Sequence, residues 1–281
     1  MAISYTFEQI ASQVRRDILR MVTNAASGHP GGSMSSTDIL TVLFFKEMNI
    51  VPEKWERNGK GSDMFFLSAG HISPVLYSIL ARRGYFPVSE LSTFRAFGSR
   101  LQGHPSIERG LPGVNQAAGS LGQGLSVAIG AALGKKLNND QNTVYVLIGD
   151  GESEEGQIWE AAASAVHHKA DNIIAMTDWN KQQIDGTTEQ VQSLGDLHAK
   201  WSAFGWETIV ADGHDFSSIA EAFGKAKELK GNGKPIMILF RTEMGHGVDF
   251  MAGTCKWHGK NPSQEQCEQG LSQLKETLGD Y

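Results

Sequence analysis

The sequence predicts an α/β protein with a doubly wound, mostly parallel sheet that carries helices on both faces. Short runs of apolar and β-branched residues alternate with segments of helical periodicity, as in sheets whose parallel strands are connected by helices. Residues 143–148 are almost entirely apolar, which is typical of a strand covered on both faces. The 281 residues include 32 glycines, which indicate many tight turns and close backbone approaches.

The expected elements follow one another in a regular order. Apolar residues at helical spacing predict the helices, and β-branched runs predict the strands. The expected helices are 6–24, 38–48, 119–136, 157–168 and 216–230, and the expected strands are 65–68, 143–148, 173–177, 208–210 and 236–240. A chain of this length is consistent with one large domain, and we expect residues 261–281 to form a short polar, helical tail. Right-handed crossovers would place the functional loops at the carboxyl ends of the strands.

Composition argues against several classes of protein. The 31 acidic and 25 basic residues give a net charge of −6, which disfavours general nucleic-acid binding. No window approaches the eighteen apolar residues of a membrane span, and the N-terminal segment lacks the apolar stretch of a signal peptide. Cys255 and Cys267 cannot build a disulfide framework or a four-cysteine zinc site. We therefore expect a cytoplasmic protein with no membrane or nucleic-acid partner.

Gly149-Asp150-Gly151 follows a predicted buried strand, and Asn180 follows the next strand along the chain. If these strands are neighbours, Asp150 and Asn180 present oxygen atoms to one point, and a main-chain carbonyl after Asn180 can add a third. Hard cations such as Mg²⁺ take oxygen ligands and often bind phosphate at the same time. A bare Gly-Asp-Gly also serves as a simple turn, but the two strand ends together favour a metal–diphosphate site.

Four of the nine histidines lie in glycine-rich turns, namely His29, His71, His104 and His258. Turn histidines are well placed to face a cleft, where they donate to hydroxyls and move protons near neutral pH. Taken alone, each histidine is more simply interpreted as a turn residue whose hydrogen bonds are satisfied. No two of them have the compact sequence spacing of zinc ligands. Together they suit a polyhydroxylated, anionic substrate. The other histidines are interpreted as surface or packing residues (His167, His168, His198) or as intermediate cases (His214, His246).

Seven ordered blocks make the chain resemble the N-terminal, diphosphate-binding region of transketolase, from about residue 14 to residue 259. They are SGHPGG (27–32), LSAGH (67–71), FRAFGSRLQGHP (94–105), GSLGQGLSVAIG (119–130), GDGESEEGQIWEA (149–161), DWNKQQIDG (178–186) and WHG (257–259). The set is far more specific than any one block. The arginines of the third block, Arg95 and Arg100, are interpreted as structural residues.

The resemblance implies roles for the matched residues. Asp150, Asn180 and the main-chain carbonyl of Gln182 would hold Mg²⁺, Ca²⁺ or Mn²⁺ on the diphosphate of thiamine diphosphate. His29, His104 and His258 would line the substrate channel as catalytic residues. The other implied cofactor residues are His71, Gly119, Leu121, Gly151 and Ile184, together with Glu155 and Glu160, which would belong to a buried acidic network at the subunit contact.

Full-length members of this family carry two further domains, and this sequence stops at Tyr281. The resemblance therefore implies a single diphosphate-binding domain over 1–281, the N-terminal subunit of a split transketolase. A separate partner subunit would bring the pyrimidine-binding and C-terminal domains in an α2β2 assembly. The pair would transfer a two-carbon ketol unit from a ketose or ketose phosphate to an aldose acceptor.

Two alternatives stay open at this point. One is a split subunit of another thiamine diphosphate enzyme, similar to deoxyxylulose-phosphate synthase or to the α subunit of a 2-oxoacid dehydrogenase. The other is a non-catalytic domain that binds a partner. The SGHPGG, QGHP and WHG blocks favour transketolase over the related enzymes, and the retained metal ligands and histidines disfavour a non-catalytic domain.

Overall fold

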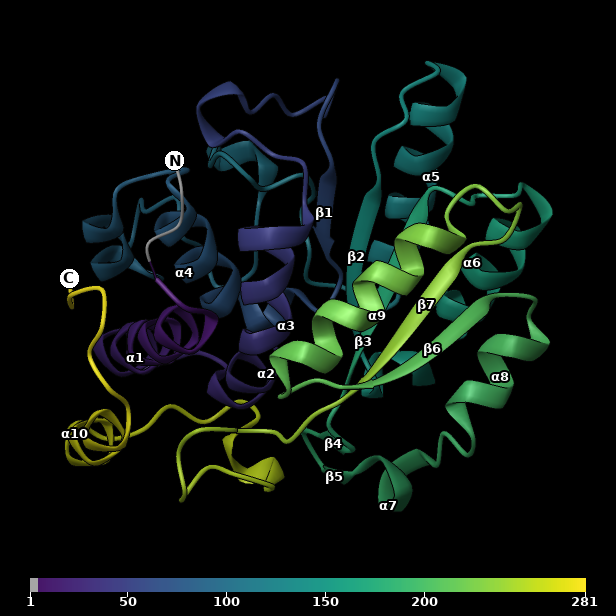
Figure 1. Cartoon of the computed structure of the whole chain (residues 1–281). Coiled ribbons are helices and arrows are strands. Elements are labelled where there is room, and N and C mark those ends of the chain that lie inside the picture. The colour runs from purple at the N-terminus through teal and green to yellow at the C-terminus, as the bar shows by residue number, and fades with distance from the viewer. Residues whose placement is uncertain (1–4) are drawn as a thin grey trace.

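A five-stranded parallel sheet forms the centre of the molecule, as a computed structural model of residues 5–281 shows (Figure 1). The strand order is β1-β2-β3-β7-β6, and every neighbouring pair runs parallel. The strands are β1 (Met64–Leu67), β2 (Val144–Gly149), β3 (Ile173–Trp179), β6 (Glu207–Asp212) and β7 (Ile236–Arg241). All five coincide with predicted strands, so the prediction of a parallel sheet is confirmed.

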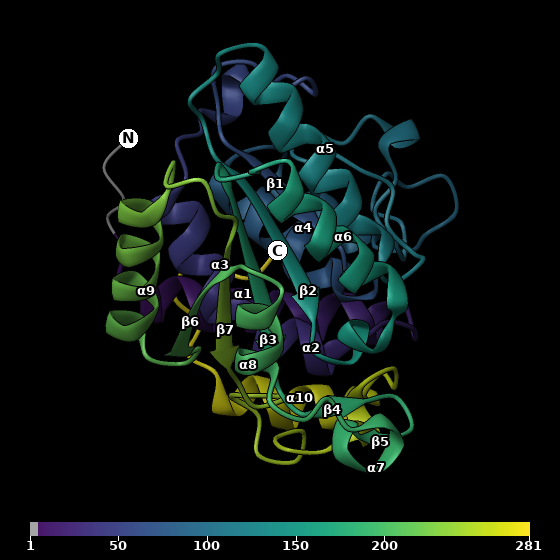
Figure 2. The ribbon, with the colours of Figure 1, turned by 90° about the vertical axis from the view of Figure 1, so that its right-hand side faces the viewer.

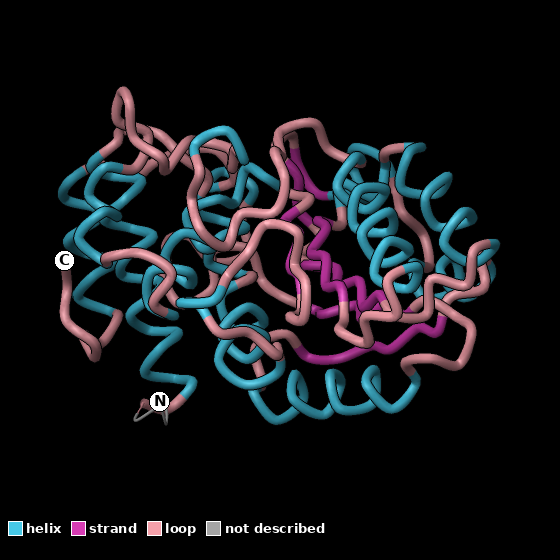
Figure 3. The backbone as a smooth tube through the Cα atoms, turned by 90° about the horizontal axis from the view of Figure 1, so that it is seen from above, coloured by secondary structure: helices cyan, strands magenta, loops and turns pink. Residues whose placement is uncertain are grey.

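Helices cover both faces of the sheet, as the view from above shows (Figure 3). One face packs against α1 (Phe7–Asn24), α3 (Thr37–Val42), α4 (Ser73–Arg83) and α9 (Phe216–Leu229), and the other against α5 (Gln123–Leu137), α6 (Gly156–His167) and α8 (Leu197–Ala203). Side chains alternate accordingly, because successive residues of a strand point to opposite faces. In β2, Tyr145 and Leu147 enter the first core, whereas Val146 and Ile148 enter the second. The doubly wound architecture is thus confirmed.

The strands end at the lower edge of the molecule in Figure 2, close to a short antiparallel hairpin and a helical turn. The hairpin is β4 (Gln182–Gln183) paired with β5 (Gly186–Thr187), and the turn is α7 (Thr188–Gln192). Both come directly from the carboxyl end of β3. This is the edge at which parallel α/β sheets bind ligands.

Some helix boundaries differ from the prediction. The helix expected from residue 119 begins at Gln123, because Gly122 has φ +84°, which a right-handed helix does not allow. The helix expected over 38–48 begins at Thr37 and ends in a π-helical turn, Leu43–Glu47. The prediction missed α2 (Pro30–Ser35) and α4, although Pro30 and Pro74 lie in their first turns, a common signal of a helix start.

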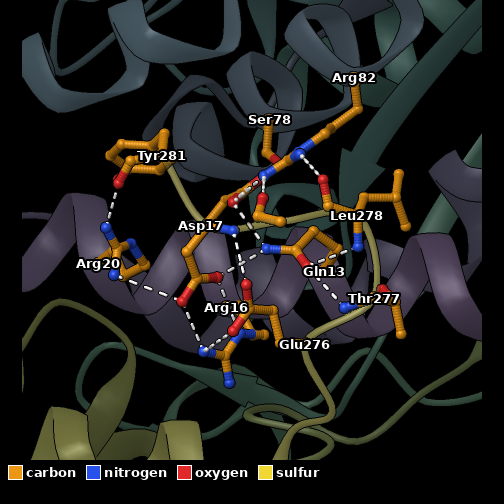
Figure 4. Close-up of polar contacts among 12 residues, drawn as sticks. Gln13, Arg16, Asp17, Arg20, Ser78, Arg82, Glu276, Thr277, Leu278 and Tyr281 are labelled. Carbon is orange, nitrogen blue, oxygen red and sulfur yellow. Dashed lines mark hydrogen bonds and ion pairs between the residues drawn. The ribbon is translucent and has the colours of Figure 1, made fainter.

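The segment expected to be a polar tail is packed against the fold. Its helix, α10 (Gln264–Gln273), contacts α1, and the last residues run back along α1 and α4 (Figures 1 and 4). Arg16 on α1 donates to Asp280 at 2.6 and 2.9 Å. The fully buried Asp17 accepts two hydrogen bonds from Arg82 and one from Ser78, both on α4. The C-terminal segment therefore belongs to the hydrophobic core on the face of the sheet that α1 and α4 cover.

No helix within residues 5–281 combines the length and the apolar character that a membrane crossing requires.

Candidate active site

A cavity of about 380 Å³ lies at the carboxyl ends of β1, β2 and β3. Its walls come from the start of α2, the loops after these strands, the loop before α5 and the segment around residue 258. The predicted site residues that line it are His29, His71, His104, Gly119, Leu121, Asp150, Gly151, Glu155, Asn180, Gln182, Ile184 and His258. Glu160 is exposed on α6 and is not part of the lining.

The predicted metal ligands meet where β2 and β3 end. These strands pair in parallel with Gly149 opposite Asp178, so Asp150 and Asn180 leave the sheet side by side. The Asp150 carboxylate accepts from the main-chain N–H of Gly151 at 2.8 Å and from that of Lys181 at 2.5 Å. Lys181 has φ +62°, which turns the chain sharply after Asn180. Asp150, Asn180 and Gln182 all line this corner of the cavity.

The charges in this corner favour a divalent cation. Asp150 and Asp178 are both buried, and neither forms an ion pair within residues 5–281. Burial and the neighbouring Asp178 raise the pKa of Asp150 to about 8, and burial also raises the pKa of Asp178. Two buried carboxyls without a basic partner are costly as anions. A bound Mg²⁺ or Ca²⁺ would compensate this charge with the oxygen ligands that such ions prefer, so the residues fit the predicted metal.

The four turn histidines converge on the same cavity. The ring centroid of His29 lies 5.2 Å from that of His71, 5.8 Å from that of His258 and 6.4 Å from that of His104. The rings of His71 and His258 stack at 5.0 Å. Buried Nδ1 atoms of His29 and His258 have no hydrogen-bond partner within the described part of the chain. All four rings line the cavity, so together they can offer hydrogen-bond donors and acceptors to a ligand.

The pKa values of all four imidazoles lie below the ordinary histidine value, which favours the neutral form at pH 7. Desolvation lowers the pKa of both His29 and His71, and the positive charge of neighbouring basic side chains lowers it further. The pKa of His29 falls to about 4 and that of His71 to about 3. The pKa values of His104 and His258 are also lowered, chiefly by desolvation. A neutral imidazole offers one acceptor and one donor nitrogen, which suits proton transfer and the recognition of hydroxyls.

Comparison with known proteins identifies the family. Residues 7–280 match the family described as "Transketolase, thiamine diphosphate binding domain". The chain belongs to this family. Its cofactor is thus thiamine diphosphate, and a metal ion is typical of the family. The transketolase assignment sets aside the related enzymes that the sequence left open.

Two relatives are named as transketolase subunits. The 6-deoxy-6-sulfo-D-fructose transketolase subunit SqwG of Clostridium sp. (strain MSTE9) is 40% identical over 94% of this chain and 94% of its own length. An apulose-4-phosphate transketolase subunit of Phocaeicola vulgatus is 37% identical over 97% of this chain and 95% of its own length. This transketolase chain therefore corresponds to the N-terminal subunit of a split enzyme.

A solved structure supports the same conclusion. Transketolase from Leishmania mexicana superimposes with a TM-score of 0.89 at 29% identity. The match covers 98% of this chain but only 43% of the Leishmania chain. The transketolase fold of this subunit is thus that of the cofactor-binding part of a longer, single-chain enzyme.

Two acidic residues of the transketolase site, Glu152 and Asp178, are not predicted from the sequence. Glu152 is buried and accepts hydrogen bonds from the Ser68 hydroxyl and from the main-chain N–H groups of Gly122 and Gly149, at 2.8 and 3.2 Å for the last two. It thereby joins three loops of the cavity. Asp178 accepts from the Ser35 hydroxyl at 2.6 Å and from Thr242. Their positions in the sequence could have identified them, because both residues lie within the matched blocks that contain Asp150 and Asn180.

Some predicted residues lie at the rim of the cavity. The side chain of Ile184 is 61% exposed in the β4–β5 turn. Glu155 lines the cavity from an exposed position, and Glu160 is exposed one turn further along α6. The predicted acidic network requires that another transketolase chain covers this surface, so it stays a prediction.

The remaining histidines lie away from the cavity. His167, His168 and His198 are exposed, as predicted. His214 and His246 stack at 3.6 Å beside Asp38. The Nδ1 atom of His214 hydrogen bonds Asp38 at 2.8 Å, and its Nε2 atom accepts from the main-chain N–H of Glu243 at 2.9 Å. Both ring nitrogens are occupied, so this cluster is a packing contact and not a second metal site.

Proposed function

We propose that this chain is the diphosphate-binding subunit of a two-component transketolase and forms its active site only with a partner subunit. The partner would carry the pyrimidine-binding and C-terminal domains, so that residues 1–281 form a single diphosphate-binding domain. The observation that carries the proposal is one cavity that combines the Asp150–Asn180 corner with four converging histidines. An α2β2 assembly follows if the complex keeps the two-fold symmetry that is most common among oligomers.

We propose that Asp150, Asn180 and the main-chain carbonyl of Gln182 hold the metal ion against the diphosphate. His71 lies in the same cavity and, being neutral, can donate a hydrogen bond to a diphosphate oxygen. Gly119, Leu121 and Gly151 also line the cavity and would contact the cofactor. When bound, thiamine diphosphate supplies the nucleophilic carbon that makes cleavage next to a sugar carbonyl possible.

His29 and His258 are the proposed proton carriers. Their rings lie 5.8 Å apart and nearly perpendicular, and both histidines line the cavity. One can therefore accept the proton of a donor hydroxyl while the other donates to an acceptor carbonyl. His104 is exposed at the mouth of the cavity, where we propose that it binds sugar hydroxyls.

The proposed donor is a ketose with a terminal anionic group. The relatives named above act on a sulfo-sugar and on a sugar phosphate, as their names state. No lysine or arginine belongs to the cavity lining formed by residues 5–281. We therefore propose that the partner subunit binds the phosphate or sulfonate, while this chain binds the reacting end of the sugar.

Calorimetry of the purified chain with thiamine diphosphate and Mg²⁺, with and without the partner subunit, tests the proposal. We expect tight binding and turnover of xylulose 5-phosphate only in the presence of the partner. Turnover by the chain alone would contradict the shared site. Use of pyruvate in place of a ketose donor would contradict the proposed reaction. The cytoplasmic location expected from the sequence stays a prediction.

A further inference from the structure

Arg95 occupies an unusual backbone conformation beside the histidine cavity. Its φ angle is +58°, a left-handed value that few residues other than glycine adopt. The main-chain N–H of Arg95 donates to the carbonyl of Leu101 at 2.8 Å, which closes the loop 95–101. Such strain persists where surrounding contacts fix the residue. The contacts of the Arg95 side chain therefore indicate what this conformation achieves.

The loop packs directly against the two turns that carry His29 and His104. A Cβ atom on Gly103, the residue before His104, would lie 2.8 Å from the guanidinium carbon of Arg95. A Cβ atom on Gly28, the residue before His29, would lie 2.6 Å from Val22 on α1 and 3.3 Å from the ring of Phe94, the residue before Arg95. Gly103 thus allows the close approach of Arg95, and Gly28 allows that of Val22 and Phe94.

The guanidinium of Arg95 bridges the same two turns. Its Nη1 atom donates to the Ser27 hydroxyl at 2.6 Å, and its Nη2 atom lies 3.5 Å from the carbonyl oxygen of Gly103. The Nε atom is buried without a hydrogen-bond partner, and Arg95 forms no ion pair in the described part of the chain. Arg100 of the same loop differs, since it pairs with Glu90 at 2.7 and 2.9 Å. The charge of Arg95 is therefore not compensated by a carboxylate.

We propose that Arg95 is a positioning residue that fixes the His29 and His104 turns against each other and places an uncompensated positive charge behind both imidazoles. This inference rests on the proposed function, because it concerns the histidines assigned there to proton transfer and substrate binding. It revises the interpretation of Arg95 as a purely structural residue and leaves that of Arg100 unchanged.

The charge of Arg95 favours the neutral form of both His29 and His104. The positive charge of Arg95 lowers the pKa of His104, second only to desolvation, and contributes with His258 and His104 to lowering that of His29. The other titratable groups that face these rings are His71 and His258, and Tyr77 faces Arg95. The negative charge of Asp185 raises the pKa of His258, which opposes the effect of desolvation there. Arg95 is thus the fixed cation in a cluster of neutral imidazoles.

Titration of the histidine side chains in the full 281-residue chain by ¹H–¹⁵N NMR tests the proposal without any need for activity. In Arg95→Met we expect the titration midpoints of His104 and His29 to move to higher pH, because the charge is lost. Arg95→Gln, which keeps donor groups but no charge, should give the same shift if the methionine variant fails to fold. Arg95→Lys should keep both midpoints low while hydrogen exchange becomes faster at the amides of Ser27 and residue 95, which donate to Val22 and Leu101. The reason is that a lysine cannot bridge Ser27 and Gly103 with two separate N–H groups.

Arg100→Met is the matched control, since it removes a paired arginine from the same loop. We expect no shift of the His104 and His29 midpoints in this variant. Unchanged midpoints in both uncharged Arg95 variants, or an equal shift in Arg100→Met, would overturn the proposal. The NMR titrations need neither cofactor nor partner subunit. A failure of this proposal can therefore be told apart from a failure of the proposed function, which the calorimetry tests.

Discussion

The side-chain amide nitrogen of Asn180 donates to a carboxylate oxygen of Asp178 at 2.9 Å. This hydrogen bond fixes the orientation of the amide, because its nitrogen is committed to a fully buried acceptor. The amide oxygen of Asn180 then faces the loop that follows β3, where it accepts from the main-chain N–H of Gln182 at 2.9 Å. Asp178 itself is held by Ser35 and Thr242. A proposed metal ligand is thus oriented by a residue that does not itself need to touch the metal.

Asp178→Asn should weaken metal-dependent cofactor binding without removing a ligand. An asparagine at this position no longer offers two acceptor oxygens, so the Asn180 amide loses its preferred orientation. Changes in residues that orient metal ligands typically cost about 10- to 100-fold in metal affinity. Calorimetry with Mg²⁺ and thiamine diphosphate in the presence of the partner subunit measures this loss. Glu221→Gln, an exposed change on α9, is the control, and equal affinities of the two variants would refute the role of Asp178.

Asp150→Ala should abolish the dependence of cofactor retention on Mg²⁺. The variant loses the buried carboxylate that accepts from the N–H groups of Gly151 and Lys181 and that we propose as a metal ligand. Gel filtration of the complex with Mg²⁺ and thiamine diphosphate, followed by assay of bound cofactor, measures retention. Retention equal to that of the wild type would show that the metal is held elsewhere.

His258→Ala should lower the turnover of the assembled enzyme by about 10²-fold or more, the usual contribution of an acid–base group. The ring of His258 lies 5.8 Å from that of His29 and 5.0 Å from that of His71, at the proposed position of the reacting sugar. The measurement is kcat with a ketose phosphate donor and the partner subunit present. His167→Ala, an exposed change on α6, is the control. An unchanged kcat would remove His258 from the proposed proton transfer.

The core of the site is predictable from sequence because it depends on strand order. Asp150 and Asn180 each follow a buried apolar run, and the carboxyl ends of adjacent parallel strands meet at one edge. His71 follows a strand in the same way. For these residues, local pattern and topology agree, so the convergence seen in the cavity is expected.

Other parts of the site depend on packing that no local pattern reveals. The α2 segment PGGSMS has poor helix propensity and is helical because it is fully buried between other elements. Glu152 looks like a solvated acid in a run of acidic residues, yet its carboxylate is buried among the hydroxyl and N–H donors of three loops. Arg95 and Arg100 look alike in sequence, and only the contact with Glu90 separates them. The C-terminal segment contains the expected helix, but its packing is not predicted, because Asp280 and Gly279 bond Arg16 and Arg82, more than 190 residues away.

His71 should make the stability of the chain depend on pH. Its pKa in the folded state is lowered to about 3, from 6.5, so the unfolded chain binds the proton first as the pH falls. The stability that the neutral ring contributes is fully present above about pH 6.5 and is lost progressively between pH 6.5 and pH 3, at about 1.4 kcal/mol per unit of pKa difference. Urea denaturation at pH 7 and at pH 4.5 should show a larger loss for the wild type than for His71→Gln. His167→Gln should behave like the wild type, and parallel losses in all three proteins would contradict the prediction.

Arg82→Met should destabilise the fold more than Arg20→Met, a change at a neighbouring arginine of α1. Arg82 donates to both oxygens of Asp17 at 2.7 and 2.8 Å, and its side chain is 5% exposed, whereas that of Asp17 is fully buried (Figure 4). Removal of one partner of a buried pair leaves an uncompensated charge and typically costs about 3–5 kcal/mol. Arg20→Met removes a more exposed arginine that lies 3.5 Å from Asp280, and pairs of this kind contribute about 1 kcal/mol or less. Urea denaturation of both variants at pH 7 compares the free energies of unfolding. A loss in Arg82→Met no larger than in Arg20→Met would show that the Asp17 carboxyl does not need its cation and is held by Ser78 and Gln13 alone.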